Sequence, residues 1–268
     1  MMNNAVLKLD DINFAFEENQ VLKDISCSVF QGEFMGIIGP NGAGKSTLIK
    51  LIAGLSTAGA GKIQLFNQPI GQFDKKSLAR RIGYVPQHID ISFPFTVEEV
   101  VAMGRYPHLR GFINKDTGAA QSIEKAMQWM DLQPLRHRPF NALSGGEKQR
   151  TVIGSVLAQE ADIFLLDEPT SALDLNHQQG IYRRLKRLSA EEGKTIIIVT
   201  HDVNLAAQFC PRLFLMHQGR CVRDGAPQDV LQFRLIEEVY GVKVYIDINP
   251  FTDSVYILPY DSDENLAL

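Results

Sequence analysis

The sequence predicts an α/β fold built on a mostly parallel sheet. Three short apolar runs, at residues 34–38, 163–166 and 195–199, have the composition of strands that are buried on both faces. Segments with helical spacing of apolar residues lie between them, and parallel neighbours need crossover connections of this kind. With 268 residues and 45% hydrophobic content, the chain can bury one large core.

The first 35 residues follow a different pattern, in which apolar and polar side chains alternate. Ile12, Phe14 and Phe16 fall on one side of the segment, as expected of antiparallel strands. A break at residues 59–61 precedes two more strand-like segments, 62–66 and 81–86. We therefore expect an N-terminal antiparallel β subdomain beside the parallel sheet.

Residues 89–160 have helical character, with helices expected over 96–104, 121–132 and 148–159. This segment is predicted to be a helical subdomain inserted into the core of one domain that spans residues 1–244. An acidic C-terminal extension, residues 245–268, follows. Its segments 244–248 and 253–258 alternate in polarity and can pair as a small hairpin.

A glycine-rich loop directly follows the apolar run at 34–38. Its backbone N–H groups can converge on phosphate oxygens, its lysine can reach the outer phosphates, and its serine hydroxyl can bind Mg²⁺. A helix-compatible segment follows the loop, which is the context that this motif requires. The sequence therefore predicts a P-loop nucleoside triphosphatase core with the phosphate-binding residues Gly39, Pro40, Asn41, Gly42, Ala43, Gly44, Lys45, Ser46 and Thr47.

Two carboxylates, Asp167 and Glu168, follow the buried run at 163–166. The carboxyl ends of parallel strands are where ligands bind in such sheets. Asp167 is suited to holding Mg²⁺, and Glu168 to activating a water molecule as general base. Taken alone, this pair would indicate only a polar turn after a strand. Its occurrence together with the phosphate loop favours a catalytic role. His201 follows the run at 195–199 at the same end, where a histidine also fits a helix cap.

Residues 144–147 read Ser-Gly-Gly-Glu. Ser144 and Glu147 have the spacing of a capping box that opens a helix. This role does not account for Gly145 and Gly146, each of which costs a helix about 1 kcal/mol relative to Ala. Bare N–H groups at the positive end of a helix can approach a phosphate, so we expect Ser144, Gly145 and Gly146 to bind one.

Composition limits the classes of partner. The net charge is −4, and the segment 245–268 alone contributes −5, from Asp247, Asp253, Asp261, Asp263 and Glu264. The remainder carries +1, so no nucleic-acid partner is expected. No apolar run approaches the ~20 residues of a membrane span, and the N-terminus lacks a leader pattern. The three cysteines lack metal-site spacing, which indicates neither zinc nor a disulfide framework.

From about residue 7 to residue 244, the chain resembles the ATP-binding cassette (ABC) family. The resemblance rests on motifs in the family's order: the phosphate loop, Gln87 after a strand, residues 143–147, the Asp167-Glu168 pair, residues 171–174 and His201. It implies that two copies sandwich two ATP molecules head to tail. Each ATP would contact the phosphate loop of one copy and Ser144, Gly145 and Gly146 of the other.

The resemblance also implies roles for single residues. Gln87 would contact Mg²⁺ or the attacking water, so Ser46, Gln87 and Asp167 form the expected metal set. His201 would contact the γ-phosphate and act with Glu168 and Gln87 in catalysis. Asp174 would communicate between the two ATP sites. Phe16 lies where the family stacks an aromatic ring on adenine, although it could equally belong to the core.

Residues 93–108, 171–178 and 200–207 resemble the ATPase subunits of bacterial importers for iron–siderophore complexes, haem and cobalamin. This implies work at the cytoplasmic face of the membrane, beside an integral membrane permease dimer and, indirectly, a substrate-binding protein. Manganese and zinc importers have similar insertions. A soluble ABC ATPase that acts on nucleic acid or ribosomes is the alternative from another class.

Overall fold

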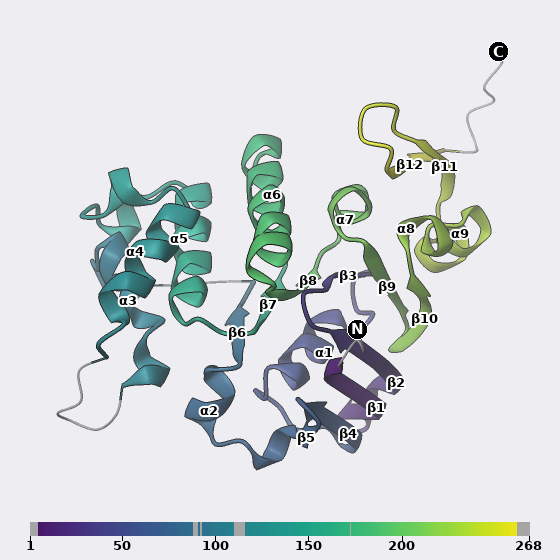
Figure 1. The fold of residues 1–268 in the computed structure, drawn as a ribbon. Coiled ribbons are helices and arrows are strands. Elements are labelled where there is room, and N and C mark those ends of the chain that lie inside the picture. The colour runs from purple at the N-terminus through teal and green to yellow at the C-terminus, as the bar shows by residue number, and fades with distance from the viewer. Residues whose placement is uncertain (1–4, 88–90, 92, 110–115, 172, 262–268) are drawn as a thin grey trace.

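The computed structural model describes residues 5–87, 91, 93–109, 116–171 and 173–261. Two sheets and a C-terminal hairpin make up its β structure (Figure 1). In chain order the strands are β1 (Ala5–Phe16), β2 (Asn19–Phe30), β3 (Phe34–Ile38), β4 (Ala60–Leu65), β5 (Gln68–Pro69), β6 (Ile82–Val85), β7 (Ile163–Asp167), β8 (Thr195–Val199), β9 (Arg212–His217), β10 (Arg220–Gly225), β11 (Lys243–Ile248) and β12 (Val255–Tyr260).

Helices connect and cover these strands. They are α1 (Lys45–Ile52), α2 (Lys75–Ala79), α3 (Val97–Met103), α4 (Ala119–Trp129), α5 (Gly145–Ala158), α6 (Leu175–Glu192), α7 (Val203–Phe209), α8 (Pro227–Val230) and α9 (Phe233–Tyr240). Local sequence sets several of their ends. For example, Thr96 and Glu99 form a capping box at the start of α3, and Gly193, with φ 63°, ends α6.

The central sheet has the strand order β10-β9-β3-β8-β7-β6. Its strands from β9 to β6 pair in parallel, whereas β10 is antiparallel to β9. The smaller sheet, β2-β1-β4-β5, is antiparallel throughout. The predicted α/β fold class, with an antiparallel N-terminal subdomain and a mostly parallel core, is therefore confirmed.

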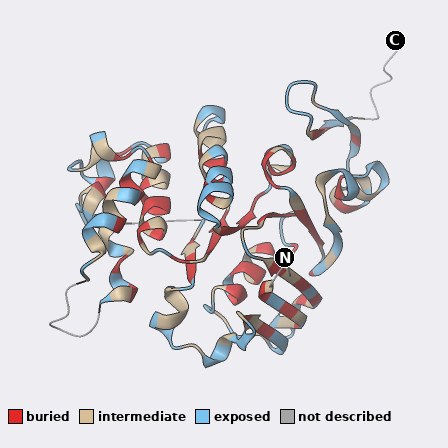
Figure 2. Cartoon of the chain, viewed as in Figure 1, coloured by how far each residue is buried: buried red, intermediate tan, exposed pale blue. Residues whose placement is uncertain are grey.

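The central sheet separates two hydrophobic clusters, and its alternating side chains enter both. On β7, Leu165 packs with α1 and the small sheet, whereas Phe164 and Leu166 pack with α5, α6 and α7. Figure 2 shows the buried residues continuing through the sheet into these helices. Burial on both faces explains why β3, β7 and β8 read as continuous apolar runs.

The helices α3, α4 and α5 lie between β6 and β7 in the chain and pack on one another to one side of the sheet (Figure 1). This arrangement is the expected helical insertion. Residues 88–90, 92 and 110–115 of the predicted range lie outside the described residues.

The C-terminal extension is joined to the core. Its hairpin, expected from residues 244–248 and 253–258, is present as β11 and β12. Val244, Val255 and Ile257 are buried in the main cluster. The Asn204 side-chain amide on α7 donates to the Ile257 carbonyl at 3.1 Å and accepts from the Ile257 N–H at 2.8 Å. The acidic residues Asp263 and Glu264 lie outside the described part of the chain.

Within the described residues, no helix is both long and apolar enough to cross a bilayer.

Candidate nucleotide site

The phosphate loop joins the end of β3 to the start of α1. Gly39 has φ +143°, and a Cβ there would lie 2.1 Å from the Met216 carbonyl oxygen, so no other residue fits. Gly42 and Gly44 have φ +78° and +95°, a region that favours glycine. The glycines therefore allow the tight turn of this loop, in which backbone N–H groups can converge on an anion.

Lys45 is 5% exposed. Its Nζ donates to the carbonyl oxygens of Gly39 at 2.7 Å and Pro40 at 2.9 Å. Burial lowers the pKa of Lys45, and the charges of Glu168 and Asp167 partly oppose that shift. The ammonium group is thus desolvated and held by weak neutral acceptors, a state in which an incoming phosphate is a strong partner.

Ser46, in the first turn of α1, lies beside Asp167, the last residue of β7. The Ser46 Oγ donates to Asp167 Oδ1 at 2.9 Å, and the Tyr84 hydroxyl lies 3.5 Å from Asp167 Oδ2. Burial raises the pKa of Asp167, against the effect of the Ser46 hydrogen bond. A hydroxyl and a carboxylate side by side are the oxygen donors that Mg²⁺ prefers, so these two residues fit the expected metal.

Glu168 lies at the centre of a polar cluster. Its Oε2 accepts a hydrogen bond from Gln87 Nε2 at 2.9 Å and lies 3.4 Å from His201 Nδ1. The backbone of Glu168 has φ 48°, and its N–H donates to the Val199 carbonyl at 2.9 Å. The cluster forms because β6, β7 and β8 are neighbours in the sheet and each is followed by one of the three side chains.

A cavity of about 790 Å³ joins the phosphate loop to this cluster. The structure thus brings most of the predicted phosphate-binding and catalytic residues to one place. Asn19 and Val21, at the start of β2, also line it and were missed, because they belong to no motif of their own. The lining residues are Asn19, Val21, Asn41, Gly42, Ala43, Gly44, Lys45, Ser46, Thr47, Gln87, Glu168 and His201.

Phe16 is 59% exposed, so the interpretation of it as a core residue is wrong. Its ring packs edge-on against Phe14, with 4.8 Å between centroids. Register shifts interrupt the pairing of β1 with β2 between Ile12 and Ala15, so the alternation that buries Ile12 does not continue to Phe16. An exposed ring near the start of β2 is available for stacking, and adenine contact at Phe16 stays a prediction.

Ser144 begins α5 as expected. Its Oγ accepts from the Glu147 N–H at 3.4 Å, and its own N–H and hydroxyl donate to Glu147 Oε2, both at 2.8 Å. These bonds to Ser144 lower the pKa of Glu147. The carboxylate therefore caps its own helix, and Arg138 lies 3.7 Å from it.

The structure does not bring Ser144, Gly145 and Gly146 to the phosphate loop of the same chain, because α5 and α1 lie on different parts of the molecule (Figure 1). Instead, Gly146 packs against the ring of His177. Asp174 caps α6 and accepts from the His177 N–H at 2.9 Å, and its carboxylate lies 2.8 Å from His177 Nδ1. Asp174 and Gly146 thus share His177 as a neighbour, and Asp174 does not line the cavity at the phosphate loop.

Among the described residues, no three His, Cys, Asp or Glu side chains gather closely enough to hold a metal ion. A cation at Ser46 and Asp167 would take its remaining ligands from Gln87, as predicted, or from water and substrate phosphates, as Mg²⁺ commonly does.

Comparison with known proteins agrees with this geometry. The family model described as "ABC transporter" matches residues 22–171, which include the phosphate loop, residues 143–147 and the Asp167-Glu168 pair. The chain belongs to the ABC transporter family. It is an ATPase, as are the ATP-binding proteins of this family's import systems.

Relatives that match nearly the whole length of this chain are import proteins. The chain is 39% identical over 255 residues to the hemin import ATP-binding protein HmuV of Rhodococcus jostii, covering 95% of this chain and 86% of that protein. It is 36% identical over 255 residues to the ferric enterobactin transport ATP-binding protein FepC of Escherichia coli, covering 95% and 94%.

Solved structures agree at the level of the fold. A chain from an inward-facing ABC transporter assigned to the metal-chelate type has a TM-score of 0.84 at 26% identity, covering 97% of this chain and 99% of that one. The dimeric bacterial ABC transporter cassette MJ0796 has a TM-score of 0.73 at 29% identity, covering 82% and 98%.

Proposed function

We propose that this ABC ATPase powers a bacterial importer of a metal chelate, such as an iron–siderophore complex, haem or cobalamin, through a separate membrane permease. The observation that carries the proposal is the position of the Glu168 carboxylate. It is held by Gln87 and His201 in a cavity that the phosphate loop also lines. The import relatives supply the direction of transport and the class of cargo.

In the proposed reaction, Lys45 and the loop N–H groups bind the triphosphate, and Lys45 exchanges its carbonyl partners for phosphate oxygens. Mg²⁺, held at Ser46 and Asp167 with Gln87 nearby, would neutralise charge on the outer phosphates when bound. Glu168 accepts a proton from the attacking water as general base. Gln87 and His201 orient the Glu168 carboxylate and the γ-phosphate.

The single chain lacks a second wall for the nucleotide, since residues 144–146 are remote from its own phosphate loop. We therefore propose a head-to-tail dimer in which each copy presents the start of α5 to the ATP of the other. Bare N–H groups at Gly145 and Gly146 would contact the γ-phosphate there. The dimeric cassette among the structural neighbours supports this assembly.

The permease would dock on an exposed apolar surface of the helical insertion. Phe93, Phe95, Met103, Tyr106 and Leu109 are exposed there, close to one another along the chain around α3. Exposed large apolar side chains in such number indicate a protein contact. Because Gln87 lies just before the insertion and binds Glu168, a contact on this surface can be transmitted to Glu168. Bound to the permease, the protein would work at the cytoplasmic face of the membrane. A substrate-binding protein would act on it only indirectly, through the permease.

Co-purification tests the proposal. The Glu168→Gln protein is tagged in its native cell, membranes are solubilised with ATP and Mg²⁺, and the partners are identified. A polytopic membrane protein is expected, and uptake of iron chelates, haem and cobalamin is then measured in cells that lack this chain. A permease that carries free manganese or zinc would replace the chelate assignment. Recovery of only soluble proteins, nucleic acid or ribosomes would overturn the importer.

A further inference from the structure

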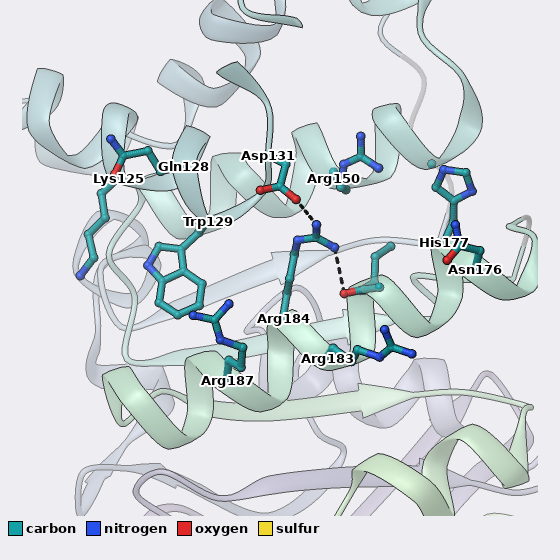
Figure 3. Close-up of a pocket in the computed structure, with 13 residues that line it drawn as sticks. Lys125, Gln128, Trp129, Asp131, Arg150, Asn176, His177, Arg183, Arg184 and Arg187 are labelled. Carbon is teal, nitrogen blue, oxygen red and sulfur yellow. Dashed lines mark hydrogen bonds and ion pairs between the residues drawn. The ribbon is translucent and has the colours of Figure 1, made fainter. Parts of the chain in front are cut away.

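A second cavity, of about 760 Å³, lies between the helical insertion and the core. Its walls come from α4 and α5 on one side and α6 on the other (Figure 3). It shares no lining residue with the cavity at the phosphate loop. We call it the basic groove, and its lining residues are Lys125, Gln128, Trp129, Asp131, Gly146, Arg150, Asn176, His177, Gly180, Ile181, Arg183, Arg184 and Arg187.

Positive charge dominates the basic groove. Five Lys and Arg side chains line it, against the single carboxylate of Asp131. Some of these cations are already engaged. Arg184 binds Asp131 and donates to the Gly180 carbonyl at 3.0 Å, as Figure 3 shows. Lys125 pairs with Glu192 at 2.6 Å, outside the lining.

Two other guanidinium groups of the basic groove, those of Arg150 and Arg183, form no ion pair within the described residues. Arg183 is exposed and donates only to the neutral Gln179 Oε1, at 2.9 Å. Arg150 is half-buried, and its Nε is buried without a hydrogen-bond partner. Burial, followed by repulsion from Arg184, lowers the pKa of Arg150, and the charges of Glu147 and Asp131 partly oppose that shift.

A half-buried guanidinium group that forms no ion pair, has one buried N–H without an acceptor and is repelled by a neighbouring cation costs free energy. An anion in the basic groove would remove that cost, because guanidinium groups bind phosphate oxygens in paired hydrogen bonds. One phosphate group of such an anion could bind Arg150. The phosphate groups linked to it could bind Arg183 and Arg184 on α6. Trp129, whose ring centroid lies 5.0 Å from the Arg187 guanidinium carbon, closes one end of the groove.

We propose that the basic groove is a binding site for a small, soluble polyphosphate anion, held chiefly by Arg150 and Arg183. A site between α5 and α6 would tie the helical insertion to the core. The start of α5 is also where Gly146 meets His177, so the bound anion would bear on the orientation of residues 144–146. The phosphate loop contributes no residue to this site, although Gly146, which the proposed dimer would present to the partner's ATP, lies in its lining.

The test separates the two sites by mutation. In full-length Lys45→Ala protein, the phosphate loop is disabled, and inorganic triphosphate is titrated by calorimetry at low salt. One triphosphate per chain is expected to bind. Adding Arg183→Gln, an exposed change that leaves the core intact, should weaken this binding about tenfold, as loss of one charged hydrogen-bonding partner predicts. Arg150→Gln should do the same, and Arg150→Lys should lose less.

The matched control is Arg234→Gln, which removes an exposed arginine from α9, far from the groove (Figure 1). It should leave the affinity unchanged. Orthophosphate, which cannot reach several guanidinium groups at once, should bind much more weakly than triphosphate. The proposal is overturned if Lys45→Ala protein binds no triphosphate, if Arg150→Gln and Arg183→Gln leave binding unchanged, or if Arg234→Gln weakens it equally. Equal affinity for orthophosphate would also overturn it.

Discussion

At the scale of single residues, Glu168 has the geometry of a catalytic base that is positioned before substrate arrives. Gln87 and His201 fix one oxygen of its carboxylate. Its positive φ holds the backbone where a side chain is rarely found. The side-chain contacts and the backbone conformation together hold this carboxylate in place beside the phosphate loop.

Glu168→Gln is expected to retain ATP binding and to lose hydrolysis by on the order of 10²-fold or more, because the amide cannot accept the proton of water. Gln keeps the size of the side chain and one oxygen for Gln87. Steady-state phosphate release and nucleotide titration measure the two properties. Glu238→Gln, on the exposed side of α9, is the control. Near-normal turnover in Glu168→Gln would remove Glu168 from the role of base.

Asp167→Asn should raise the thermal stability of the nucleotide-free protein at pH 7. The pKa of Asp167 is raised by burial, so its ionised form costs the native state free energy at neutral pH. Protonation removes this cost. The advantage of Asn should therefore shrink as the pH falls through the raised pKa of Asp167 toward the ordinary value of 3.8. Melting temperatures from pH 7 to pH 4 test this.

The control for this series is Asp253→Asn, an exposed change in the turn of the C-terminal hairpin, which should show no such trend. If Asp167→Asn were less stable than the unchanged protein at pH 7, the hydrogen bond from Ser46 would stabilise the ionised carboxylate by more than its burial costs. The same substitution should weaken Mg²⁺-dependent ATP binding, since one of its two proposed protein oxygens loses its charge.

At the scale of elements, α5 begins with a reciprocal pair of hydrogen bonds between Ser144 and Glu147, which uses the Glu147 N–H and not those of Gly145 and Gly146. The glutamate is directed at its own helix end, where negative charge is favourable. A carboxylate in this position is therefore compatible with an anion on the other side of the helix start.

Glu147→Gln should lower the free energy of unfolding by less than about 1 kcal/mol, because Gln also completes a capping box. ATP hydrolysis should change by less than about twofold, since the carboxylate does not face the nucleotide. Chemical denaturation and phosphate release measure these effects. A large gain in ATP affinity would show instead that the charge repels phosphate.

At the scale of the whole molecule, the two halves of the nucleotide site lie on different parts of one chain. The loop and Glu168 are on the core, whereas Ser144 begins a helix of the insertion (Figure 1). In the proposed head-to-tail dimer, a second copy brings these parts together around one ATP. Assembly and nucleotide binding should therefore depend on each other.

In the Glu168→Gln background, ATP with Mg²⁺ should convert the protein to a dimer. Adding Ser144→Arg should prevent the dimer while leaving ATP bound to the single chain, because the phosphate loop is untouched. Size-exclusion chromatography with light scattering, and nucleotide titration, measure the two. Glu168→Gln with Arg234→Gln is the control and should dimerise. An ATP-dependent dimer that survives Ser144→Arg would contradict the head-to-tail arrangement.

The sequence by itself determined the fold class, the phosphate loop, the Asp167-Glu168 pair and the capping box at Ser144. Each of these features consists of residues close together in the sequence. Their local geometry follows from the conformational freedom of glycine, the composition of buried strands and the hydrogen bonding of helix caps. The continuous apolar runs of β3, β7 and β8 reveal two-sided burial for the same reason.

The tertiary structure alone decided which distant residues meet. Gln87 and His201 reach Glu168 because β6, β7 and β8 are adjacent in the sheet, an order that the residues themselves do not specify. Phe16 proved to be exposed, although its alternation matched that of Ile12, because register shifts in the pairing of β1 with β2 lie between the two residues. The basic groove arises only where α4 and α5 pack against α6, since its cations are scattered along the chain from Lys125 to Arg187. Contacts between distant segments depend on packing and topology, which no local pattern records.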